Sequence, residues 1–159
     1  MVNISPFRHS KADSGVMDNA RCPFERAILS AQCACEMAER FSIAEHAGVE
    51  CRSDLARNNC QVLLALMRER ARFALKVTGS AASLPFGKEM KVMIGGLIGL
   101  HQALSAAHER GAGVQNIHAL VQQAQSLYGS LEALPYREIV KSIAAFRSRR
   151  RGSVPPFTR

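Results

Sequence analysis

Apolar residues spaced three and four positions apart recur in five segments of this chain, and this spacing most constrains its fold. The clearest segment runs from about residue 54 to 77, and the same period marks 23–41 and 87–110. Two more such segments begin near Ile117 and Pro135. A repeat of 3.6 residues is typical of an α-helix with one buried face, and no window shows the strict alternation of a half-buried strand.

Helix-boundary residues support this interpretation. Pro23 suits the first turn of a helix over 23–41, and Ser53 or Asp54 can cap the next one. The stretch 78–86 contains Pro85 and small residues, which indicates a linker.

The sequence therefore predicts an all-α protein, a single-domain bundle of four to five helices over residues 21–148. Residues 1–20 show no periodicity and predict a flexible arm, and 149–159 predict a basic, proline-containing tail. The absence of Trp and the presence of only two Tyr among 159 residues also favour helix over sheet.

Three glycines interrupt the apolar helix predicted over 87–110. Gly95, Gly96 and Gly99 fall within five residues, and each costs a helix about 1 kcal/mol relative to alanine. We expect a neighbouring helix backbone, or else a ligand, to approach closely at this point.

The cysteines are the main chemical signal. All five lie within 39 residues, and the 99 residues that follow contain none: Cys22, Cys33, Cys35, Cys51, Cys60. If 23–41 and 54–77 form an antiparallel helical hairpin, Cys35, Cys51 and Cys60 converge near its closed end, whereas Cys22 lies about 30 Å away. On a helix Cys33 lies on the opposite side from Cys35.

Grouped thiolates are typical ligands of a structural metal or an iron–sulfur cluster. We predict a site with Cys35 and Cys60 at its centre, Cys51 next and Cys22 fourth, with Cys33 as the spare thiol. A mixed site completed by His46 is an alternative. Two others remain open: the cysteines are small buried hydrophobes, or they form a thiol switch.

Several functional classes lack the residues they need. The longest apolar run, 92–100, is too short to span a membrane, and residues 1–20 contain no signal-peptide core, so we expect a cytoplasmic location. No H-x-x-x-H, E-x-x-H, P-loop, G-x-G-x-x-G after a strand, or G-x-S-x-G sequence is present. This favours a non-enzymatic role.

Positive charge is concentrated at the C-terminus. Residues 137–159 contain seven Lys and Arg and one acid, and four arginines fall within five positions: Arg147, Arg149, Arg150, Arg151. Such a run favours a polyanionic partner. An acidic protein is our first expectation and nucleic acid the alternative, because aromatic residues are scarce near the run.

Two functions fit these patterns. In the first, a cysteine-ligated metal or iron–sulfur site makes the protein an electron carrier or accessory factor, which the basic tail docks onto an acidic partner. In the second, the cysteines are structural and the protein is an adaptor or regulator that binds an acidic protein or nucleic acid through its tail.

Overall fold

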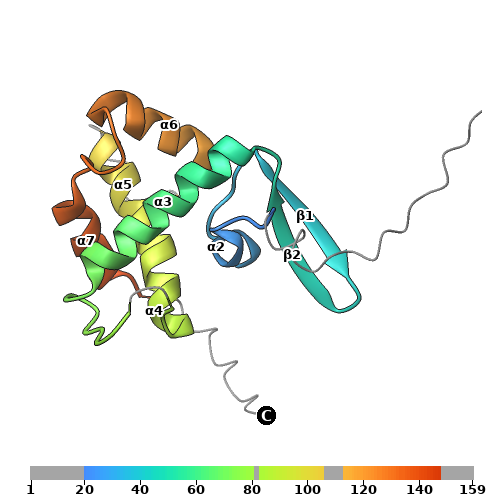
Figure 1. Ribbon diagram of the computed structural model, residues 1–159, viewed down its shortest axis with the longest axis horizontal. Helices are drawn as coiled ribbons and strands as arrows, with labels where there is room; N and C mark the ends of the chain where they lie inside the picture. The colour runs from blue at the N-terminus through green and yellow to red at the C-terminus, as the bar shows by residue number, and fades with distance from the viewer. Residues whose placement is uncertain (1–19, 81–82, 106–112, 148–159) are drawn as a thin grey trace, which may run out of the picture.

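The computed structural model describes residues 20–80, 83–105 and 113–147, and within them helices pack beside a small sheet (Figure 1). The sheet is a two-stranded antiparallel hairpin of β1 (Ala38–Ile43) and β2 (His46–Cys51). Five helical rods make up the rest: α2 (Glu25–Leu29), α3 (Asp54–Ala71), a continuous rod from α4 (Phe86–Met90) through π-helical η1 (Lys91–Gly95) into α5 (Gly96–Leu104), α6 (Ile117–Tyr128) and α7 (Tyr136–Ala145). The prediction of an all-α bundle is therefore wrong, because the fold mixes helices with a β-hairpin.

The error lies in the segment 23–41, where the helix stops after five residues. The Ser30 hydroxyl donates to the Ala27 carbonyl at 2.8 Å, and Ala31 has a φ of 60°, in the left-handed region that ends helices. The Arg40 guanidinium, on β1, donates to the Ile28 carbonyl at 3.1 Å. A carbonyl group at the end of α2 thus receives its hydrogen bond from the hairpin that follows.

A tight turn and one glycine set the register of the hairpin. Ile43 pairs with His46 across the two-residue loop, where Ala44 has a φ of 54°. Gly48 pairs with Phe41, and a Cβ at Gly48 would overlap the Phe41 ring, so a side chain there would displace the ring. The Glu25 carboxylate accepts the Val49 backbone N–H at 2.8 Å, which ties the hairpin to α2.

The other predicted helices are present with adjusted bounds. The starts near 54, 117 and 135 are confirmed, but α3 ends at Ala71 rather than near Val77. Residues 106–110, predicted as the end of the helix over 87–110, lie outside the described residues, as do the predicted tail over 149–159 and all but the last residue of the predicted arm over 1–20.

The glycines pack against helix α7, which confirms the expected close approach of a neighbouring helix. A Cβ at Gly95 would lie 2.9 Å from the Ile143 Cα, and one at Gly99 would lie 3.0 Å from the Ile139 Cα. Gly96 instead faces the flexible Met67 side chain of α3. Among the described residues, no helix combines the length and apolar character that crossing a membrane requires.

Candidate metal centre

Cys22 and Cys51 are brought together by backbone pairing beside β2. Arg21 forms an antiparallel bridge with Glu50, the Cys22 N–H donates to the Val49 carbonyl at 2.9 Å, and the Cys51 N–H donates to the Ala20 carbonyl at 2.9 Å. Directly opposite residues of two paired strands share a face, and so do residues two positions apart along one strand. Cys22 is opposite Val49, which is two positions from Cys51, so Cys22 and Cys51 lie on the same face. The expected separation of about 30 Å between Cys22 and the other thiols is wrong, because there is no long helix to create it.

Cys35 reaches the same region through a turn before β1. The Ala38 N–H donates to the Cys35 carbonyl at 3.2 Å, and Ala38 pairs with Cys51 in the hairpin register. The turn is also held by the segment that leads into α6. The Ala34 N–H donates to the Val114 carbonyl at 2.9 Å, and the Ile117 N–H donates to the Ala34 carbonyl at 3.0 Å.

Cys60 comes from the second turn of α3. The Ser53 side chain caps this helix by accepting the Ala56 N–H at 3.2 Å, and the Cys51 thiol donates to the Ser53 carbonyl at 3.2 Å. The cap therefore links the strand that carries Cys51 to the helix that carries Cys60. Cys60 is buried, with 8 % of its surface exposed.

Electrostatic coupling shows that these four thiols lie near one another. Burial raises the pKa of Cys60 to about 12, and the thiols of Cys22, Cys35 and Cys51 contribute to the rise because like charges repel. Burial likewise raises the pKa of Cys22 to about 12; a hydrogen bond with Phe24 opposes the rise, and Cys35, Cys51 and Glu25 add to it. The four predicted ligands thus converge although the helical hairpin expected to join three of them does not exist.

Cys33 and His46 lie apart from this group. Cys33 is buried beside Val114, its bridge partner, and burial is the sole cause that raises its pKa to about 11. His46 lies at the hairpin tip, five residues along β2 from Cys51 or about 17 Å. The alternative of a mixed site completed by His46 is therefore wrong.

Two thiols of the group, Cys22 and Cys60, have a pKa raised by burial. Thiols with a pKa raised to about 12 stay neutral near pH 7, so a metal must displace their protons to bind. Within the described ranges, no three His, Cys, Asp or Glu side chains are grouped closely enough to hold a metal ion. The thiols are neighbours, and ligation would need them to draw closer.

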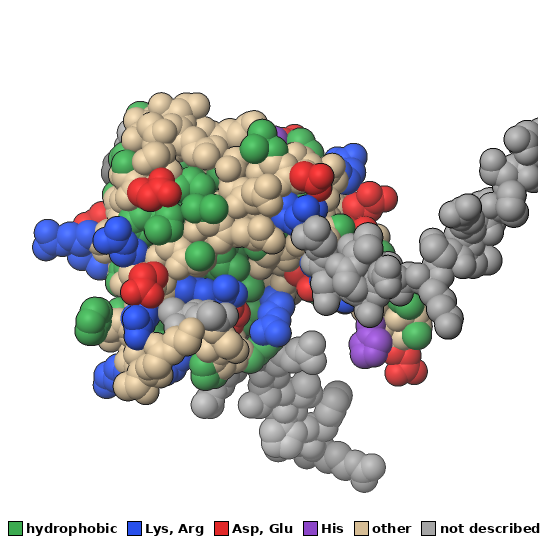
Figure 2. Space-filling view, viewed as in Figure 1, with side chains coloured by type: hydrophobic (Ala, Val, Ile, Leu, Met, Phe, Trp, Pro, Cys, Tyr) green, Lys and Arg blue, Asp and Glu red, His purple; other side chains and the backbone are tan. Residues whose placement is uncertain are grey.

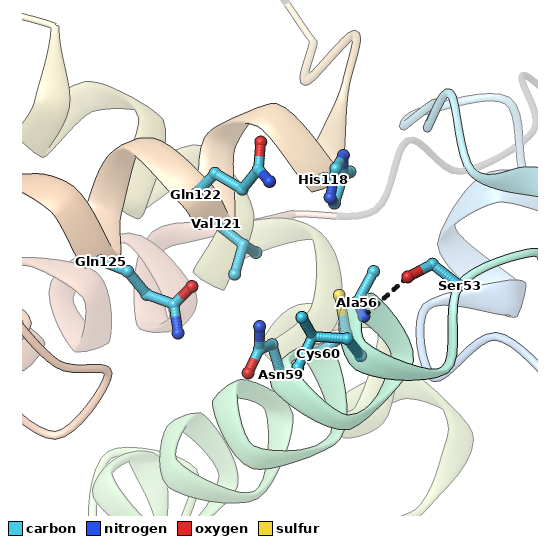
Figure 3. Close-up of a pocket in the computed structure, with 9 residues that line it drawn as sticks. Ser53, Ala56, Asn59, Cys60, His118, Val121, Gln122 and Gln125 are labelled. Atoms are coloured by element: carbon cyan, nitrogen blue, oxygen red, sulfur yellow. Dashed lines mark hydrogen bonds between the residues drawn. The ribbon is translucent and has the colours of Figure 1, made fainter.

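A pocket of about 150 Å³ between α3 and α6 adjoins the group (Figure 3). Cys60 and Asn59 line it from α3, and His118, Gln122 and Gln125 line it from α6. Figure 3 shows the Cys60 sulfur on the side of α3 that faces α6. Leu55, Ala56 and Val121 also line it, so Cys60 belongs to a pocket of mixed polar and apolar lining.

A side-chain pair that the sequence did not suggest fixes the turn bearing Cys35. His118 Nδ1 lies 2.8 Å from Glu36 Oε1, and the hydrogen bond with His118 is the main cause that lowers the pKa of Glu36. Asn116, the cap of α6, accepts the Glu36 N–H at 3.3 Å. Because Glu36 and His118 are 82 residues apart, no local spacing could have revealed the pair.

Of the predicted partner-binding arginines, only Arg147 is within the described residues, two positions after the end of α7; Arg149, Arg150 and Arg151 lie outside them. Comparison of the chain with protein-family models, curated proteins and solved structures found no match.

Proposed function

We propose that this protein is a small cytoplasmic carrier of a cysteine-ligated metal or iron–sulfur centre that acts as an electron carrier or accessory factor for an acidic partner. The observation that carries the proposal is the convergence of Cys22, Cys35, Cys51 and Cys60. Four thiolates suit zinc or an iron–sulfur cluster.

The surrounding structure supports this function in two ways. Backbone hydrogen bonds fix Cys22 and Cys51 beside β2, and the Glu36–His118 contact anchors the turn of Cys35 to α6. Bound metal would add a cross-link among these segments and α3, so its binding energy would stabilise the fold.

The test is the composition of protein purified without oxygen. Metal analysis and acid-labile sulfide assays should find either about one zinc per chain without colour, or iron with matching sulfide and a brown colour. Protein that lacks both, and that takes up neither Zn²⁺ nor a cluster when supplied with Fe²⁺ and sulfide under reducing conditions, would contradict the proposal.

The second candidate is the adaptor with structural cysteines, and the burial of Cys33 and Cys60 in the hydrophobic core favours it. This candidate predicts a metal-free protein. In it, Cys60→Ala should lower the free energy of unfolding by no more than another small truncation in the core does. Loss of bound metal in that variant would exclude it.

A further inference from the structure

One end of the molecule combines basic side chains with exposed phenylalanines. Phe73, just after α3, is 97 % exposed, and Phe86, at the start of α4, is 65 % exposed. The segments 68–80 and 86–91 contain six Lys and Arg but two acids, Glu69 and Glu89, and Glu89 is buried against Arg68. Figure 2 shows Lys and Arg side chains gathered over this end, at the lower left.

Contacts between the segments make this a continuous surface. The Arg72 guanidinium donates to the Gly79 carbonyl at 2.6 Å, which closes the loop after α3. The Lys88 ammonium lies 3.5 Å from the Lys76 carbonyl and joins that loop to α4. Arg26 of α2 lies over the Phe86 ring, 5.4 Å from its centroid, so the surface extends to α2.

The described chain also ends on this side. A Cβ on Gly95 in η1 would lie 2.9 Å from the Phe146 Cβ, so Arg147 follows a residue packed against the rod that carries Lys88 and Lys91. This contact lies about two turns beyond Lys88 along the same helical rod.

We propose that this basic–aromatic surface binds single-stranded nucleic acid, with Phe73 as a stacking platform for a base. A ring exposed on nearly its whole surface is costly to leave in water, and it offers the flat face that a base stacks on. The lysines beside it would neutralise backbone phosphates. Aromatic residues are scarce near the arginine run in the sequence, but the fold exposes two phenylalanines beside these lysines.

This inference goes beyond the proposed function and does not depend on a bound metal. An acidic protein would be attracted by the same lysines, but charge attraction alone does not require the ring of Phe73. Binding of single-stranded nucleic acid should therefore depend on Phe73, whereas binding of an acidic protein should not.

The test is fluorescence anisotropy of labelled single-stranded oligothymidylate titrated with the full chain at several salt concentrations. We expect Phe73→Ala to weaken binding about tenfold or more without changing the salt dependence. Lys76→Gln with Lys88→Gln should reduce the salt slope by about 0.7 per lost phosphate contact. Leu127→Ala, at another exposed apolar residue (63 %) on α6, is the matched control and should bind like the parent.

Three results would overturn the proposal. They are no binding by the parent at low salt, equal affinity for duplex and single strand with no loss in Phe73→Ala, or tighter binding to poly-glutamate than to the oligonucleotide. Thermal melting of each variant shows whether the fold is retained, and Phe73→Tyr, which keeps an aromatic ring, should restore most of the affinity lost in Phe73→Ala.

Discussion

At the scale of single residues, the cysteines owe their positions to specific neighbours. Cys22 is set by hydrogen bonding of its N–H to Val49, and Cys60 by a helix that starts at the Ser53 cap. The thiols of Cys22, Cys33 and Cys60 all have a raised pKa, and burial is the main cause in each case. Protonated thiols therefore belong to the metal-free folded state.

This burial predicts that the metal-free protein loses stability at alkaline pH. The three thiols ionise near pH 9.0 in the unfolded chain but only at about 11 to 12 when folded. Between those values the folded state binds more protons, so the free energy of unfolding should fall as pH rises, by up to about 1.4 kcal/mol per pH unit for each thiol. Urea denaturation with chelator and reductant at pH values from 8 to 11 checks this. A stability that stays constant or rises over that range would contradict the assigned burial.

At the scale of the elements, the closest packing is between α7 and the rod of α4, η1 and α5. There is no room for a Cβ at Gly95 or Gly99, because it would lie closer than van der Waals contact to the Cα of Ile143 or Ile139. A Cβ at Gly87, near the start of α4, would meet no other atom within 4 Å.

We expect opposite effects from the same substitution at these glycines. Gly95→Ala should destabilise the protein by about 1–3 kcal/mol, because the backbone of α7 must move to admit the methyl group. Gly87→Ala should stabilise it by up to about 1 kcal/mol, because alanine favours a helix more than glycine does. Chemical denaturation of both variants and the parent measures the difference, and equal effects at the two positions would argue against this packing.

The elements also show what the sequence could predict. The helices α3, α6 and α7 were predictable because their apolar faces and capping residues, such as Ser53, lie within or directly beside the element itself. The segment 23–41 was not, since the helix is ended by Ala31 in a left-handed conformation and by Arg40 from a later strand. The cysteine set was predicted from clustering and from a helical hairpin that does not form. Cys22 meets Cys51 instead through pairing of residues 20–22 with β2, which depends on partners about 30 residues away.

At the scale of the whole molecule, α3 runs between two regions of different chemistry that adjoin at α2. The thiol group lies at its N-terminal end beside the hairpin, and the basic–aromatic surface lies at its C-terminal end (Figure 1). Cys60 and Ala71, eleven steps apart on α3, are separated by about 17 Å along the helix. The two regions adjoin at α2, because Cys22 lines one pocket together with Arg26 and Arg68.

The arginine run should act in binding rather than in folding. Changing Arg147, Arg149, Arg150 and Arg151 together to Gln should shift stability by less than about 0.5 kcal/mol, because the run follows the last helix and its packed residue Phe146. Association with a polyanion should slow, most strongly at low salt. Stopped-flow titration against single-stranded RNA, duplex DNA and an acidic polypeptide separates the partner classes; unchanged rates with all three would limit the run to a solubilising role.

The most direct measurement is the metal content of Cys60→Ser compared with Cys33→Ser, each purified without oxygen beside the parent. Both substitutions replace a buried thiol with a hydroxyl, so they match in chemistry and differ in whether the thiol belongs to the group of four. We predict that Cys60→Ser loses the metal and unfolds more easily, whereas Cys33→Ser keeps the full amount. Full metal content in Cys60→Ser, or its complete loss in Cys33→Ser, would contradict the assignment.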